Sequence, residues 1–166
     1  MATTFREAKI ADLKYIVNVY NESIPGRMAT ADLKPITVAD RKEWFYQHNP
    51  TTRPLLIILN DKQPVGWVSL NSFYGRQAYH NTVEISIYLD NKFQGKKLGS
   101  KTLDFVEENA SRYGFKTILA FVFGHNTPSI KLFENHGYSG WADLPKVAEL
   151  DGVQRDLVIL GKRVRN

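Results

Sequence analysis

The chain has 166 residues, of which 43% are hydrophobic and 23% are charged, and this ordinary globular composition excludes disordered, coiled-coil and collagen-like classes. We expect residues 1–166 to form a single domain. The absence of cysteine excludes a disulfide framework, a thiolate zinc site and a cysteine nucleophile, and it predicts a cytoplasmic location.

The formal net charge is +5, and the basic residues are spread along the chain apart from Lys96, Lys97 and Lys101. This distribution is that of solvated surface lysines. The one cluster would suit a few phosphates better than a nucleic-acid duplex. Because the basic residues are otherwise spread out, we do not expect a nucleic-acid partner. No apolar run approaches the roughly 18 residues that span a bilayer, so we do not expect a membrane partner either.

The first half of the chain reads as two helices followed by three strands. Apolar residues at three- and four-residue steps from Ile10 to Ile24 predict the first helix. Thr37 and Asp40 indicate the start of a second helix, which stops before Asn49. The strand-like runs are 54–59, 65–73 and 82–89, and they suggest an antiparallel meander.

The second half reads as a helix, a strand, a helix and a hairpin. The predicted helices are 98–113, closed by Gly114, and 128–136, closed by Gly137, with a buried strand at 117–123 between them. Runs 141–150 and 153–160 flank Asp151-Gly152, a dipeptide favoured in two-residue hairpin turns.

The segment from Ser86 to Ser100 is the most informative for chemistry, because a strand runs through a polar, glycine-containing loop into a helix. The N–H groups and dipole at the start of a helix suit a pyrophosphate, and Gly95 and Gly99 would let a ligand approach the backbone. A plain strand-to-helix turn is the alternative reading of the same segment.

Residues 94–99, Gln-Gly-Lys-Lys-Leu-Gly, resemble the Q/R-x-x-G-x-G/A pyrophosphate loop of the GNAT superfamily of acyl-CoA-dependent N-acetyltransferases. Lys97 replaces the middle glycine of that motif, so the motif does not fix the backbone conformation at this position. The lysine side chain could add a contact to phosphate. The element order also matches this family. The resemblance implies an α/β (α+β) fold with a mixed, mostly antiparallel central sheet that splays at the cofactor cleft and is flanked by helices.

A narrower resemblance is to the phosphinothricin and methionine sulfoximine N-acetyltransferases, and it rests on scattered short motifs such as Phe73–Tyr79 and Thr82–Tyr88. It implies a homodimer that transfers acetyl from acetyl-CoA to the α-amine of a small amino-acid-like substrate, as in detoxification. A peptide or protein amine, or a CoA-binding sensor without turnover, are the alternatives.

The resemblance also implies which residues contact the acetyl-CoA. The backbone of the strand before the loop would pair with the pantetheine arm, and Asn126 and Ser129 would contact CoA near the next helix. For Asn126, simple helix capping is the competing explanation. The predicted cofactor-binding set is Ile87, Tyr88, Leu89, Gln94, Gly95, Lys96, Lys97, Leu98, Gly99, Ser100, Asn126 and Ser129.

Glu84 is the predicted catalytic residue. An amine attacks only as the free base, and a carboxylate within an apolar strand has a raised pKa suited to accepting its proton. The alternative is a glutamate paired with Arg76 or a lysine. Phe73, Arg76 and Thr30 are the predicted substrate-binding residues, with the Arg76 fork suited to a substrate carboxylate or phosphinate. A surface arginine stacked on tyrosine is the other reading of Arg76.

Two groups of side chains are expected to stay out of the chemistry. Many GNAT enzymes place a tyrosine, as general acid for the thiolate, where this chain has Phe133, so no acid is assigned, and Tyr88 or an ordered water could substitute. The four histidines show no ligand spacing with carboxylates, and no metal site is expected.

Overall fold

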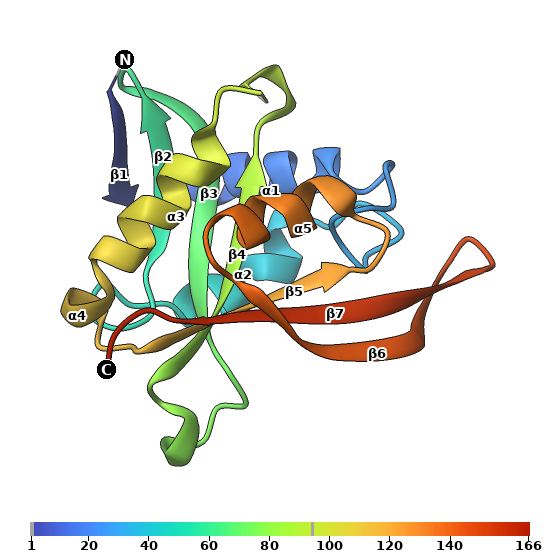
Figure 1. The fold of residues 1–166 in the computed structure, drawn as a ribbon. Coiled ribbons are helices and arrows are strands. Elements are labelled where there is room, and N and C mark those ends of the chain that lie inside the picture. Colours follow the sequence, from blue (N-terminus) through green and yellow to red (C-terminus); the bar gives the residue numbers. More distant parts are fainter. Residues whose placement is uncertain (1, 94) are drawn as a thin grey trace.

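The computed structural model describes residues 2–93 and 95–166, and it is built around one seven-stranded sheet in the order β1-β2-β3-β4-β5-β7-β6 (Figure 1). Neighbouring strands are antiparallel except for the parallel pair β4 and β5. The strands are β1 (Thr3–Glu7), β2 (Leu55–Asn60), β3 (Gln63–Ser72), β4 (Thr82–Leu89), β5 (Thr117–Phe123), β6 (Ser139–Leu150) and β7 (Val153–Arg163). The helices are α1 (Leu13–Glu22), α2 (Val38–Tyr46), α3 (Leu98–Glu108), α4 (Ala110–Tyr113) and α5 (Thr127–Asn135). The predicted mixed, mostly antiparallel α/β architecture is confirmed.

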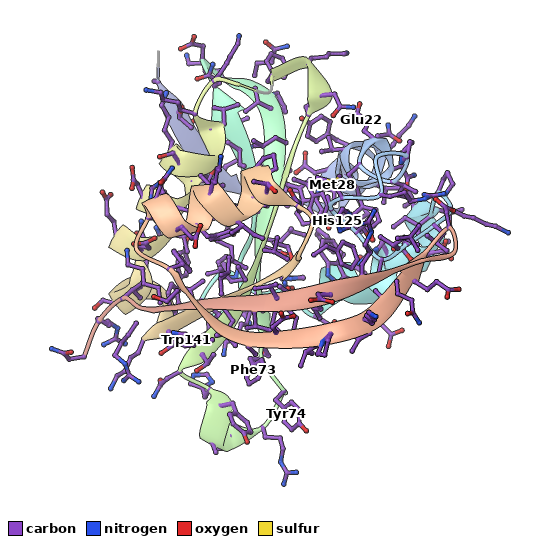
Figure 2. The ribbon with its side chains drawn as sticks, turned by 45° about the vertical axis from the view of Figure 1, so that its right-hand side comes forward. Glu22, Met28, Phe73, Tyr74, His125 and Trp141 are labelled. Atoms are coloured by element: carbon purple, nitrogen blue, oxygen red, sulfur yellow. The ribbon has the colours of Figure 1, made fainter. Side chains whose placement is uncertain are left out.

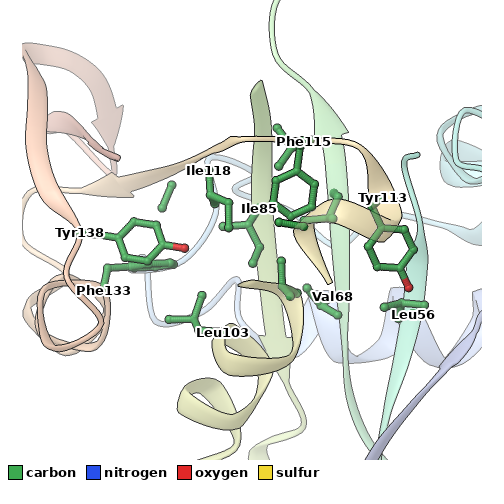
Figure 3. Close-up of a cluster of buried hydrophobic side chains, with 14 of the residues drawn as sticks. Leu56, Val68, Ile85, Leu103, Tyr113, Phe115, Ile118, Phe133 and Tyr138 are labelled. Carbon is green, nitrogen blue, oxygen red and sulfur yellow. The ribbon is translucent and has the colours of Figure 1, made fainter. Parts of the chain in front are cut away.

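Helices cover both faces of the sheet. α3 and α5 lie on one face and α1 and α2 on the other (Figure 1). Alternation along each strand gives each face its own apolar cluster. The α3 side holds the larger cluster, in which Val68, Ile85, Leu103 and Phe115 meet (Figure 3). The α1 side holds a smaller one that includes Ile16 and Trp67.

The strand β1 was not among the predicted elements. Its five residues include only one large apolar side chain, Phe5, so no alternation is visible in the sequence. The strand forms because β2 offers it a complete antiparallel partner, from Thr3 opposite Asn60 to Glu7 opposite Leu56.

The predicted helix boundaries are mostly confirmed. Thr37 and Asp40 form the expected capping box of α2, and Gly114 ends α4 in the left-handed conformation. The helix predicted over 98–113 is interrupted, because Asn109 leaves helical geometry and its side-chain amide donates to the Phe105 carbonyl at 2.8 Å. Ile10 was expected on the buried stripe of the first helix, but it is exposed.

The last two strands form the predicted hairpin, and both extend further than expected. Asp151 and Gly152 each have a positive φ, of 53° and 81°, which is the geometry of the tight turn their sequence favours. The hairpin curves away from the rest of the sheet at its tip (Figure 1).

The sheet opens between its two parallel strands. β4 and β5 pair only from Thr82 to Glu84 on one strand and from Thr117 to Leu119 on the other. β4 runs on to Leu89 and β5 to Phe123, so the strands separate beyond Glu84. Across residues 2–93 and 95–166, none of the helices is both long and apolar enough to cross a membrane.

Candidate active site

A cleft of about 740 Å³ occupies the gap where β4 and β5 separate. Its walls come from β4, β5, the start of α5 and the segment that joins α1 to α2, with contributions from α3 and the last two strands. The lining residues include Glu22, Met28, Ala29, Thr30, Glu84, Ile87, Tyr88, Leu89, Gly99, Phe121, Asn126, Ser129, Phe133 and Val147. Segments far apart in sequence therefore converge on one space that suits a small-molecule ligand.

Glu84 lies at the inner end of this cleft, at the last paired position of β4. Burial raises the pKa of its carboxyl, while hydrogen bonds from Ser86 and Asn71 oppose that rise. The Ser86 hydroxyl donates to Glu84 Oε1 at 3.1 Å. Within the described part of the chain Glu84 has no ion pair, so neither Arg76 nor a lysine neutralises it. A carboxylate with a raised pKa and no cationic partner can accept a proton near neutral pH.

Ile87, Tyr88 and Leu89 form one wall of the cleft and leave a strand edge open. On one side they pair with Val68, Trp67 and Gly66 of β3. On the other side the part of the sheet that the structure describes gives them no partner, because the pairing with β5 ends at Glu84. Their backbone groups on that side can pair with an extended, amide-containing ligand.

The loop that enters α3 combines two left-handed residues. Gly95 has φ +83°, and Lys97, the N-cap of α3, has φ 60° and ψ 24°. Lys97 therefore adopts the backbone conformation that glycine would take more easily. The first backbone N–H groups of α3 have no partner within the helix, which makes its start suitable for phosphate oxygens.

The other residues predicted for this loop lie in different surroundings. Gly99 lines the cleft, whereas the Leu98 side chain is buried in the larger apolar cluster. The Lys96 ammonium lies 5.6 Å from the centre of the Phe93 ring, and Ser100 Oγ lies 2.7 Å from His136 Nε2. Gln94 was also predicted to bind cofactor and lies outside the described residues.

Asn126 acts as the N-cap of α5, because its side-chain oxygen accepts from the Ser129 N–H at 3.3 Å. Its amide also donates to the Met28 carbonyl at 3.1 Å. Asn126 and Ser129 both line the cleft. Asn126 therefore caps α5, and because it also lines the cleft it can contact a ligand there.

The segment between α1 and α2 is fastened over the cleft at several points. His125 Nε2 donates to the Arg27 carbonyl at 2.8 Å, and the Arg27 guanidinium contacts Asp151 at the hairpin tip at 2.6 Å. Figure 2 shows Met28 and His125 next to each other at this side of the molecule. Contacts with His125, which precedes α5, and with the tip of the β6–β7 hairpin therefore hold the α1–α2 segment over the cleft.

Thr30 lines the cleft, and it is buried beneath the same segment. Its hydroxyl contacts the Tyr20 hydroxyl, which also donates to Asp32. The Tyr88 hydroxyl donates to the neighbouring Ala29 carbonyl at 3.0 Å, and burial raises the pKa of Tyr88. Tyr88 therefore keeps its proton at neutral pH and holds the α1–α2 segment at Ala29 through this hydrogen bond.

Phe73 and Arg76 lie outside the residues that line the cleft. Both belong to the loop between β3 and β4, which projects away from the sheet (Figures 1 and 2). The Phe73 ring lies 6.4 Å from that of Phe121, a lining residue, so it borders the cleft mouth. Arg76 is exposed. The loop is close to the opening, but it does not place the Arg76 fork inside it.

Phe133 is buried against Tyr138 and lines the cleft, so a phenyl ring stands where a tyrosine acid would be expected. Tyr138 itself directs its hydroxyl to Glu107, at 3.4 Å. Among the described residues, no group of three histidine, aspartate or glutamate side chains could hold a metal ion.

Sequence reasoning missed the polar neighbours of Glu84. Asn71 is directly opposite Glu84 in the β3–β4 register, and His48 Nε2 lies 2.8 Å from Asn71 Oδ1. The alternation of β3 would have placed Asn71 on the face of Glu84 once the register was known. His48 gave no such signal, because it reaches this face only through the packing of α2.

Comparisons with known proteins show the family to which this chain belongs. The model of the family described as "Acetyltransferase (GNAT) family" matches residues 16–138. A Bacillus subtilis protein, provisionally named a phosphinothricin acetyltransferase, is 44% identical over 97% of this chain and 99% of its own length. The Pseudomonas aeruginosa L-methionine sulfoximine/L-methionine sulfone acetyltransferase is 27% identical over 96% and 94%. Among solved structures, the Sinorhizobium meliloti phosphinothricin acetyltransferase in complex with acetyl-CoA superposes with a TM-score of 0.90, at 26% identity, covering 99% and 90% of the two chains.

Proposed function

Because this chain belongs to the GNAT family and is an acetyl-CoA-dependent N-acetyltransferase, we propose that it acetylates the α-amine of phosphinothricin, methionine sulfoximine or a similar small amino acid. The observation that carries the proposal is the unneutralised Glu84 carboxylate at the inner end of the cleft. The names of the relatives supply the substrate class.

Two observations support the binding of acetyl-CoA in the cleft. The backbone of Ile87, Tyr88 and Leu89 offers an open strand edge to the amides of a pantetheine arm. The left-handed residues Gly95 and Lys97 bring N–H groups to the start of α3, where a pyrophosphate would be held. Acetyl-CoA supplies the acetyl group, and these residues hold the thioester near Glu84.

Glu84 accepts the proton of the ammonium substrate, directly or through water, and the free amine then attacks the thioester carbonyl. The C–N bond forms as the C–S bond breaks, the thiolate leaves, and the second proton of the acylated nitrogen passes to that thiolate or to water. A thiolate with an ordinary pKa of about 8.5 can leave without full protonation, which is consistent with Phe133 at the usual acid position. Transfer is direct, in a ternary complex, with no acyl-enzyme.

Thr30, with its neighbours in the α1–α2 segment, limits the size of the amine. Phe73 and Arg76 would contact the far end of the substrate if their loop folds towards the cleft mouth. Arg76 could then pair with the substrate carboxylate or phosphinate.

Three wider proposals complete this function. Residues 1–166 form a single GNAT domain, the enzyme acts in the cytoplasm, and it is a homodimer. The homodimer is supported by large apolar side chains that the single chain leaves exposed on its last strands, among them Trp141 at 51% and Val147 at 59%.

Thiol release from acetyl-CoA tests the proposal, with methionine sulfoximine, phosphinothricin and a panel of amino acids as acceptors. The natural chain is compared with Glu84→Gln and Arg76→Ala. We expect Glu84→Gln to lower kcat by about 10² to 10⁴ with unchanged acetyl-CoA binding. We expect Arg76→Ala to prevent saturation by the amine.

Tight acetyl-CoA binding without thiol release on any small amine would overturn the substrate assignment. Activity on a peptide amino terminus would then identify a peptide acetyltransferase, and no release at all would identify a CoA-binding sensor.

A further inference from the structure

We infer that His136 positions the Ser100 hydroxyl so that it donates to a phosphate oxygen of acetyl-CoA at the start of α3. The inference rests on the proposed function, in which the loop that enters α3 holds the pyrophosphate. His136 is a positioning residue in this arrangement, because its ring acts on the cofactor through Ser100.

Ser100 lies at the end of α3 that suits a phosphate. It is the third residue of the helix, and the residue before it, Gly99, lines the cleft. The N–H groups of the first helical turn have no partner within the helix. Side chains on a helix lean towards its N-terminus, so the Ser100 hydroxyl leans towards these free N–H groups.

An imidazole holds this hydroxyl from the other side. Ser100 Oγ lies 2.7 Å from Nε2 of His136, the residue that follows α5. The His136 side chain is only 14% exposed. Burying an imidazole is costly unless its ring nitrogens have polar partners, and Ser100 supplies one of them.

The donor and acceptor properties of the three groups fix the direction of the hydrogen bonds when a phosphate is bound. An ionised phosphate oxygen only accepts, so the single proton of the Ser100 hydroxyl must point to the phosphate. The hydroxyl oxygen then accepts, and His136 Nε2 has to be the donor. The result is a chain of hydrogen bonds from His136 through Ser100 to the phosphate.

The charged groups around the ring are compatible with this direction. Asp104, one turn beyond Ser100 on α3, places Oδ1 3.5 Å from His136 Nδ1, and its side chain is 63% exposed. From β7, Lys162 Nζ donates to the His136 carbonyl at 2.6 Å and pairs with Glu107 of α3. Among the described residues, Asp104 is therefore the one carboxylate that faces the imidazole. The neutral Nε2–H tautomer and the imidazolium both provide the donor that Ser100 needs.

Packing keeps the two partners together. α3 and α5 lie on the same face of the sheet (Figure 1). A Cβ on Gly99 would lie 2.9 Å from the Leu132 side chain, so the first turn of α3 is seated directly on α5. This close approach keeps Ser100 within reach of His136. A purely structural tie between the two helices is the competing explanation of the same contact.

Calorimetric titration with acetyl-CoA, in the absence of any amine, separates the two explanations. We expect His136→Phe and Ser100→Ala each to raise the Kd for acetyl-CoA about tenfold, because each breaks the chain of hydrogen bonds to an anion. His136→Gln, whose amide can donate near the position of Nε2, should restore part of the affinity. An unchanged Kd in His136→Phe would overturn the inference.

The double variant of His136→Phe and Ser100→Ala tests whether the imidazole acts through the hydroxyl. Its Kd should be no higher than that of the weaker single variant, since nothing is left for His136 to position. Two effects that multiply to about a hundredfold would overturn the positioning role.

Histidine ¹⁵N NMR of the natural chain gives a readout that a structural tie would not determine. In the acetyl-CoA complex near neutral pH, Nε2 of His136 should carry a proton, and His136→Gln identifies its signals. An unprotonated Nε2 in that complex would overturn the inference.

Turnover with two acetyl donors supplies the functional readout, because S-acetylpantetheine lacks the pyrophosphate and the adenosine. We expect His136→Phe to lower kcat/KM about tenfold for acetyl-CoA and to leave it unchanged for S-acetylpantetheine. Tyr138→Phe is the matched control, since the Tyr138 hydroxyl donates to Glu107 of the same helix α3, at 3.4 Å, and should affect neither donor. An equal loss with both donors would show a structural role only and overturn the positioning role.

If no amine accepts the acetyl group, the proposed function fails, whereas the titration and the NMR need no acceptor and still decide the role of His136.

Discussion

At the scale of single residues, the site depends on side chains and backbone angles that are unfavourable by themselves. Glu84 is a carboxylate in a mostly apolar strand, and Lys97 is a lysine in a left-handed conformation. Each has a consequence for stability that can be measured separately from activity.

Glu84→Gln should make the protein more stable at pH 8. The folded-state pKa of Glu84 is raised, so the folded chain binds more protons than the unfolded chain between the two pKa values, and stability falls as pH rises through that range. Below the unfolded pKa of about 4.3 the difference should vanish. Thermal unfolding of both proteins from pH 4 to 8 measures this. A variant that is less stable at pH 8 would contradict a desolvated carboxylate.

Lys97→Gly should raise the free energy of unfolding by up to about 1 kcal/mol, because a left-handed non-glycine residue costs about 1–2 kcal/mol and glycine loses part of that gain through its greater unfolded-state entropy. Denaturant unfolding checks this. Lys101→Gly is the matched control, because Lys101 lies within helical α3, and it should destabilise by about 1 kcal/mol. Destabilisation by Lys97→Gly would show that the lysine side chain has a structural role.

At the scale of elements, the pairing of β3 with β4 sets the shape of the open strand edge. Gly66 faces Leu89 across this pair, and the two backbones are so close that a Cβ on Gly66 would lie 2.5 Å from the Tyr88 oxygen. Only glycine fits there, because the two nearest atoms, the Tyr88 oxygen and the Leu89 Cα, are backbone and cannot rotate away.

Gly66→Ala should therefore destabilise the protein by about 1–3 kcal/mol, the usual range for overpacking, and it should weaken acetyl-CoA binding by shifting Tyr88 and Leu89. Chemical denaturation and calorimetric titration with acetyl-CoA measure the two effects. Gly26→Ala is the control, since the nearest atom to its added Cβ would be 3.9 Å away. Equal effects of the two substitutions would contradict the close approach of the strands.

Most elements could be predicted because their signals are local. The Thr37 capping box, the Asp151-Gly152 turn and the alternation in β4 each lie within a few residues. The short strand β1 was missed because its own residues show no apolar alternation, and it forms only by pairing with β2. The cleft residues on β4 could be proposed from the GNAT resemblance, whereas Asn71 and His48 needed the register and the packing of α2.

At the scale of the whole molecule, the single chain leaves part of its apolar surface uncovered. Trp141 lies on Gly161 of the next strand, and Phe73 and Tyr74 lie towards the same lower side of the molecule in Figure 2. This surface is the one we expect a second copy of the chain to cover.

Trp141→Glu should convert a dimer to a monomer, because it places a charge in a buried interface. Sedimentation of both proteins over a range of concentrations measures this. Tyr46→Glu is the control, since Tyr46 is similarly exposed, at 69%, but lies on α2 on another part of the surface. A natural chain that sediments as a monomer at all concentrations would contradict the dimer.

The opening between β4 and β5 also bears on how this protein avoids aggregation. An unpaired strand edge is a template on which another polypeptide can add. Here the edge from Ile87 to Leu89 is internal, and it is enclosed by the Met28–Ala31 segment on one side and by α5 on the other. A slender ligand can enter such a slot, whereas a second strand carrying full side chains cannot. The enclosure that shapes the proposed cofactor site therefore also protects the folded chain from edge-to-edge pairing with its neighbours.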